Sequence, residues 1–182
     1  MKLYRYVGPK QIAERVRAEP AGEPIRSSLD VLAWIRNSGQ ELSGGCIIAT
    51  FVIDATGVLL VADRRSEHVV CAGGRLVQSA GEITFSVDRE VEVVAVSNQS
   101  TGYCPEPESW MSVAAALLAA GMKPPAGFDL ACNFRRCIRC SGLTLVKDEA
   151  FECAECGAEL PAAYNCQIPD VKLETEPDHD GK

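Results

Sequence analysis

Residues 47–61 read IIATFVIDATGVLLV, and this stretch indicates the class of fold. Its two apolar segments, Ile47–Ile53 and Val58–Val61, are rich in β-branched residues, which favour strands. Between them lies DATG, a sequence typical of a hairpin turn because glycine tolerates the left-handed backbone that such turns require. The stretch therefore predicts two paired strands of a short sheet.

Further strand-like segments lie on both sides of this hairpin. Alternation of apolar and polar residues is the pattern of a half-buried strand. Two glycine-containing pairs, Gly73-Gly74 and Ala80-Gly81, indicate tight turns or a close approach of another backbone. We therefore expect a mainly antiparallel sheet, with strands at 3–7, Arg75–Gln78, Glu82–Ser86 and Val91–Val96.

Three helices are expected to flank the sheet. The first, over residues 9–18, begins at Pro9, which costs no hydrogen bond in a first helical turn. Ser27 and Asp30 have the spacing of a capping box for a second helix through Ile35. A third helix is expected over Trp110–Ala120, because this stretch is rich in helix formers and Gly121 follows it. Residues 1–125 are thus predicted to form one α+β domain.

The cysteines indicate a metal site near the C-terminus. Two C-x-x-C pairs are separated by the twelve residues from Ser141 to Glu152. Each pair is typical of a zinc knuckle, and four thiolates leave no open coordination position on the metal. We therefore predict one structural Zn²⁺ in a zinc ribbon over residues 130–166. Its ligands would be Cys137, Cys140, Cys153 and Cys156.

The ribbon is too small to bury a core of its own and needs the metal as a staple. A short hairpin of Leu143–Lys147 and Ala150–Glu152 is expected between the two cysteine pairs. Gly142 and Gly157 follow the pairs, where the chain has to turn sharply. Cys132 and Cys166 flank the pairs and are interpreted as bystanders.

Composition and charge limit the classes of function. The chain has 182 residues, nine cysteines and a formal net charge of -7. A chain of this length can form a core, so the cysteines are better explained by metal than by disulfides. Broad affinity for nucleic acid is not expected from an acidic chain. Residues 167–182 are acidic and are predicted to form a disordered tail.

The sequence lacks both an apolar run long enough to cross a bilayer and the apolar core of a secretory signal. We therefore expect no contact with membranes and a cytoplasmic location. Four basic residues of the ribbon leave two interpretations open. They balance the charge of the thiolates, or they contact nucleic acid, although no aromatic residues alternate with them. These residues are Arg135, Arg136, Arg139 and Lys147.

Three stretches resemble the core domain of plant IQ-motif calmodulin-binding proteins and related domains of bacterial effector-like proteins. They read EHVVCAGG (67–74), AGE (80–82) and NQSTGYCP (98–105), and the resemblance covers residues 48–121. Two departures are Val69-Val70 in place of two serines and Gly102 in place of a histidine. An IQ helix is missing, so calmodulin binding is not expected. The resemblance implies a shared fold with a pocket near His68, Ser100 and Tyr103.

Two functions from different classes follow from these residues. The first is a zinc-binding adaptor or ligand-binding protein that acts through a protein partner and holds a small ligand in this pocket. The second is a hydrolase or transferase in which His68 activates Cys104, because an imidazole can turn a thiol into a reactive thiolate. We favour the first and assign no catalytic residue. The expected ligand-binding residues are His68, Glu82, Ser100 and Tyr103.

Overall fold

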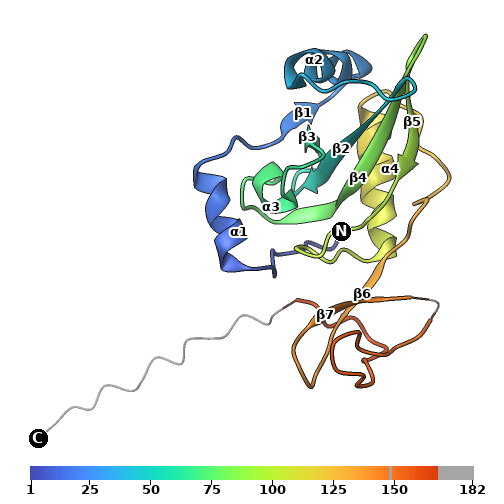
Figure 1. Cartoon of the computed structure of the whole chain (residues 1–182). Helices are drawn as coiled ribbons and strands as arrows, with labels where there is room; N and C mark the ends of the chain where they lie inside the picture. The colour runs from blue at the N-terminus through green and yellow to red at the C-terminus, as the bar shows by residue number, and fades with distance from the viewer. Residues whose placement is uncertain (148, 168–182) are drawn as a thin grey trace, which may run out of the picture.

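Strand β2, Cys46–Asp54, lies at the centre of a five-stranded antiparallel sheet in the computed structural model (Figure 1). The structure describes residues 1–147 and 149–167. The strand order is β1-β3-β2-β4-β5, and a smaller sheet of β6 and β7 follows. The predicted α+β class with an antiparallel sheet is confirmed. The other strands of the large sheet are β1 (Glu23–Ile25), β3 (Leu59–Asp63), β4 (Val77–Val87) and β5 (Val91–Val96).

The predicted hairpin joins β2 to β3. Asp54 Oδ1 accepts hydrogen bonds from the backbone N–H groups of Thr56 (2.8 Å) and Val58 (2.9 Å). Gly57 has a φ of 89°, a backbone conformation that favours glycine. Asp54 therefore stabilises the turn with its side chain, and Gly57 allows the backbone conformation that the turn requires.

The expected break at Ala80-Gly81 is wrong, because β4 runs through both residues. A Cβ built on Gly81 would lie 1.9 Å from Ser97 O. The glycine thus allows the close approach of the backbone that leaves β5, which was the alternative interpretation of this pair. Gly81 is needed for packing against Ser97 and not for a turn.

The expected strand at residues 3–7 is also wrong. Tyr4 forms a single bridge with Val77, and the next hydrogen bond between backbone groups joins Val7 N to Gly102 O at 2.8 Å. The chain therefore leaves the sheet after one residue. The edge position beside β3 is taken by β1, a strand that was not predicted.

In the part of the chain that the structure describes, four α-helices surround the sheet, one more than predicted. Ser27 caps α2 by accepting a hydrogen bond from Asp30 N, as the spacing predicted. The additional helix, α3, has four residues and is too short to show a helical repeat in the sequence. The helices are α1 (Lys10–Glu14, followed by a 3₁₀ turn at Arg15–Arg17), α2 (Ser28–Ser38), α3 (His68–Cys71) and α4 (Trp110–Ala119).

Both faces of the sheet are covered. Phe51 and Ile53 of β2 pack with residues of α2 and α4, whereas Val52 packs on the opposite face with residues of α3. Figure 1 shows the same arrangement, with α1 and α3 together on one side. Successive side chains of a strand point to opposite faces, so a strand covered on both faces is apolar throughout. This explains the continuous apolar run of β2.

The C-terminal part differs from the predicted hairpin. Strand β6 (Asn133–Arg136), which precedes the first cysteine pair, is the partner of β7 (Leu143–Val146). The expected pairing of β7 with residues 150–152 is reduced to one bridge between Lys147 and Ala150. Glu149 has a φ of 57° at the turn between them. The tight turn ends the pairing that the sequence pattern predicted.

Two further expectations concern membrane-spanning helices and the C-terminal tail. Among the residues that the structure describes, no helix has the length and apolar character to cross a bilayer. Of the predicted tail, Gln167 is described, and its side chain accepts a hydrogen bond from Arg5 N at 2.8 Å. The remaining tail residues, 168–182, lie outside the described part of the chain.

Candidate functional site

The four predicted metal ligands meet at one point. All four thiol sulfurs lie within 4.8 Å of one another. The sulfurs of Cys137 and Cys156 are 3.7 Å apart, and those of Cys140 and Cys153 are 3.5 Å apart. Zn–S bonds of about 2.3 Å in a tetrahedron place sulfurs about 3.8 Å apart. The arrangement therefore fits a metal ion at its centre.

The two cysteine pairs fold in the same way. Cys137 N donates to Gly142 O, and Cys153 N donates to Ala158 O, both at 2.8 Å. The residue after each pair has a positive φ, which is 62° at Ser141 and 67° at Gly157. Gly157 thus makes the turn predicted for it. In the first pair Ser141 makes the turn, and not Gly142 as expected.

Backbone N–H groups point at the sulfurs. Arg139 N lies 3.4 Å from Cys137 Sγ. The N–H groups of Glu155 and Cys156 lower the pKa of the Cys153 thiol to about 6. Since thiolates and not thiols bind metals, these bonds prepare the site for an ion.

Gly142 has a different role from the one expected. A Cβ built on it would lie 2.5 Å from Glu155 Oε2, so the two knuckles pack closely here. The Glu155 carboxylate also lies 3.6 Å from Cys140 Sγ, on the exposed side of the cluster. The protein's own ligand set is complete with four sulfurs, and Glu155 lies outside it.

Three cysteines outside the metal cluster form a separate buried group. Cys104, Cys132 and Cys166 pack together with Phe134 between the ribbon and the sheet domain. A hydrogen bond with Cys166 and burial raise the pKa of the Cys104 thiol. Cys132 and Cys166 therefore contribute to packing.

Asn98 joins the ribbon to the domain, and sequence analysis did not single it out. Its amide donates to Pro105 O at 2.8 Å and to Cys132 O at 2.9 Å. Its Oδ1 accepts a bond of 2.6 Å from Cys132 N. The side chain is fully buried. In the sequence, Asn98 is recognisable only as an amide residue just beyond a predicted strand. This is a weak indication of a structural role, because such residues are common in loops.

The ligand-binding residues predicted from the sequence lie in two different environments. His68 and Glu82 line one cavity of about 340 Å³. Tyr103 is buried, and its hydroxyl donates to Arg75 O at 2.8 Å. Ser100 is buried as well, and its hydroxyl accepts a long bond from Tyr103 N. The structure thus brings His68 and Glu82 together and places Ser100 and Tyr103 in the packing beneath them.

His68 and Cys104 have separate partners. His68 Nε2 donates to Gly81 O at 3.1 Å, and burial lowers the pKa of the ring to about 4. The Cys104 thiol donates to Thr101 O at 3.2 Å. A neutral imidazole and a thiol with a raised pKa do not form an activated pair. The geometry therefore gives no support to the catalytic alternative.

Comparisons of the chain with protein-family models, with curated proteins and with solved structures find no match.

Two of the four basic residues of the ribbon donate hydrogen bonds to backbone carbonyl groups of the fold. Arg135 donates to Ala162 O and Phe134 O and is buried. Arg136 donates to Ser141 O at 2.9 Å. Arg139 and Lys147 remain exposed. Two exposed cations on an acidic chain are a weak basis for binding phosphates.

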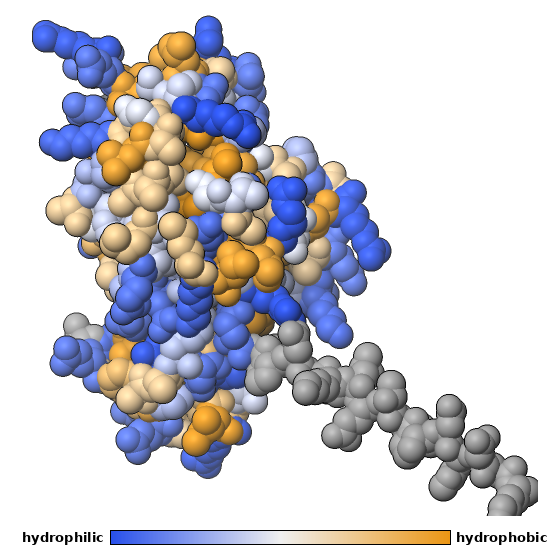
Figure 2. All heavy atoms as spheres, turned by 180° about the vertical axis from the view of Figure 1, so that it is seen from behind, coloured by the Kyte–Doolittle hydropathy of each residue, from blue (hydrophilic) through white to orange (hydrophobic). Residues whose placement is uncertain are grey.

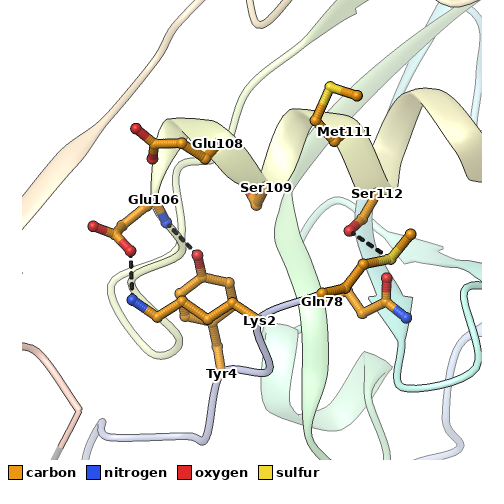
Figure 3. Close-up of a pocket in the computed structure, with 9 residues that line it drawn as sticks. Lys2, Tyr4, Gln78, Glu106, Glu108, Ser109, Met111 and Ser112 are labelled. Atoms are coloured by element: carbon orange, nitrogen blue, oxygen red, sulfur yellow. Dashed lines mark hydrogen bonds and ion pairs between the residues drawn. The ribbon is translucent and has the colours of Figure 1, made fainter.

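A further cavity, of about 240 Å³, lies between the N-terminal residues and the start of α4 (Figure 3). Lys2 forms an ion pair with Glu106 at its rim, and Glu106 N donates to the hydroxyl of Tyr4. Met111 of α4 lines the cavity and is itself 71 % exposed. The cavity therefore continues onto the outer face of α4.

The outer face of α4 is apolar. The helix sequence, WMSVAAALLA, contains no charged residue. Met111 and Leu118 are exposed on it, with Ala115 and Ala119 beside them. Seen from behind, apolar residues gather over the part of the domain that α4 covers (Figure 2). Contiguous exposed apolar surface of this kind marks interaction sites on soluble proteins.

Proposed function

We propose that this chain is a binding protein that recognises a protein partner non-covalently and carries one structural Zn²⁺ in its C-terminal ribbon. The observation that carries the proposal is the uncharged, exposed face of α4. A solvent-facing helix surface normally carries polar residues, so an apolar one indicates a covering partner. The partner would be a protein segment that presents apolar side chains.

The metal has a structural role in this proposal. Four thiol ligands saturate a tetrahedral ion and leave no position for water or substrate. Zn²⁺ suits four sulfurs in this geometry and has no redox chemistry. No disulfide joins any of the nine cysteines, as is typical of a reducing compartment, so a cytoplasmic location belongs to the same proposal.

A double substitution on α4 tests the proposed docking surface. Met111→Glu with Leu118→Glu places two charges on the exposed face without touching the core, so the fold should persist. The wild-type chain is cross-linked to its partners in its native cell. We expect the double variant to capture less of these partners, because burying a carboxylate in the interface is costly. The measurement is quantitative mass spectrometry of the captured proteins.

Leu29→Glu provides the matched control, because Leu29 is an equally exposed apolar residue on α2. It should leave the set of captured proteins unchanged. If the double variant and the control capture the same proteins in the same amounts as the wild type, α4 is not the docking surface.

A further inference from the structure

His68 lies between two cavities that differ in character. The first, of about 340 Å³, is polar and contains Glu82 and Gln99. The second, of about 150 Å³, is largely apolar. Both cavities are lined by the same three residues, Glu67, His68 and Thr101. The two cavities are therefore adjacent at these residues.

The imidazole of His68 offers one defined hydrogen-bonding group to these cavities. Gly81 O accepts the bond from Nε2, and a carbonyl can only accept, so Nε2 carries the proton. Nδ1 of the neutral ring is then an acceptor. Among the described residues, the enclosed side-chain atoms that lack a hydrogen-bond partner belong to Gln40, Gln78 and Arg136. Nδ1 is not among these atoms, and it can accept a hydrogen bond from an N–H or O–H donor.

The charges around the polar cavity are balanced. Arg64 lies 4.0 Å from the carboxylate of Glu82. Arg15 lies 3.4 Å from the carboxylate of Glu67. The charged side chains that line this cavity are two arginines, Arg64 and Arg65, and two glutamates, Glu67 and Glu82. Their formal charges cancel, so the site favours a neutral ligand over an ion.

The apolar cavity has a rigid wall and a wall supplied by the ribbon. A Cβ built on Gly102 would lie 2.5 Å from the ring of Tyr6, so this ring fills the space over the glycine. Leu143, the first residue of β7, also lines the cavity. It follows Cys140 by three residues. The metal centre thus holds one wall of the cavity in place.

We propose that the two cavities form one binding site for a small neutral molecule that joins an N–H or O–H donor to an apolar ring. The donor binds Nδ1 of His68, and the ring lies between Tyr6 and Leu143. Because Leu143 belongs to the ribbon, loss of the metal lowers the affinity for this ligand. The inference deepens the proposed function, since it rests on the chain being a binding protein and not an enzyme.

Indole and 1-methylindole form the matched pair of probes, because methylation removes the N–H group and keeps the ring. The full metal-loaded chain is titrated with each, and the ¹H–¹⁵N signals of the His68 ring are followed by NMR. We expect indole to shift these signals and to bind about threefold to tenfold more tightly, as one hydrogen bond would give. Equal affinities, or no shift of the ring signals at saturating indole, would overturn the inference.

Two variants of β7 test the contribution of the ribbon. Leu143→Ala should weaken the binding of indole severalfold, whereas Leu145→Ala should not, because Leu143 lines the cavity and Leu145 does not. Equal effects of both would remove Leu143 from the site. Metal content and the α4 variants are measured on the same preparations, so failure of indole binding is distinguishable from failure of the proposed function.

Discussion

At the scale of single residues, His68 couples folding to pH. Burial lowers the pKa of its ring from 6.5 to about 4 in the folded chain. Between these two values the unfolded chain binds more protons than the folded chain, so protons favour unfolding. The stability contributed by the neutral ring is complete above pH 6.5 and is lost as the pH falls toward the folded pKa.

The variant His68→Gln tests this coupling, because glutamine keeps a donor for Gly81 O and does not titrate. From pH 7.5 to pH 5 the wild type should lose about 2 kcal/mol more free energy of unfolding than the variant. The measurement is denaturant unfolding at both pH values. Metal ligands also bind protons in acid, but they do so in both proteins and cancel in the difference. Parallel losses would show that His68 titrates normally.

Glycine positions show what a sequence can and cannot predict at this scale. Ala80-Gly81 indicated either a turn or a close backbone approach, and the choice depended on Ser97, which is distant in the sequence. Gly57 and Gly157 were predictable because their turns are local. Ser141 was not, because a non-glycine residue with positive φ is uncommon.

At the scale of elements, Asn98 connects β5 to the ribbon. Its side chain pairs with both backbone groups of Cys132 and with Pro105 O. Tyr164 adds a second connection, because its hydroxyl donates to Cys104 O at 2.8 Å. The ribbon is therefore fixed to the sheet domain at both of its ends.

Asn98→Ala should destabilise the chain by about 2–4 kcal/mol, because it leaves buried backbone groups of Cys132 without partners. Thermal unfolding measures this loss, and hydrogen exchange at Cys132 N should become faster. The neighbouring Gln99 is exposed, so Gln99→Ala is the control and should change stability little. Protection of Cys132 N that is equal in both variants would mean that Asn98 does not hold the ribbon.

The elements found from the sequence are those with long local patterns. Strands β2, β3, β5 and β7 and helices α1, α2 and α4 have apolar repeats, turns or caps within a few residues of one another. Helix α3 is too short for a repeat, and β1 contains a proline within a polar segment. The pairing of β6 with β7 depends on the position of the cysteine cluster, which spacing alone did not predict.

At the scale of the whole molecule, the resemblance to the IQ-motif core domain stays a prediction. The structure adds one physical detail to it. The ring of Tyr6 occupies the space over Gly102, where the resembling domains present a histidine. A histidine at this position would have to displace Tyr6.

The four-cysteine cluster joins the two halves of the ribbon. The ribbon in turn packs on the domain through the buried group of Cys104, Cys132 and Cys166. Leu143 extends this packing to the cavity beside His68. Loss of the metal should therefore loosen the ribbon, its contact with the domain and one wall of the cavity together.

The most direct test is the amount of zinc bound per chain, measured by elemental mass spectrometry on protein purified without added metal. The wild type and the control Cys46→Ser should each carry about one zinc ion, because Cys46 lies on β2 outside the cluster. Cys137→Ser and Cys153→Ser should each lose the ion, because three thiolates bind it far more weakly. Wild-type protein without zinc, or full retention in both cysteine variants, would contradict the account.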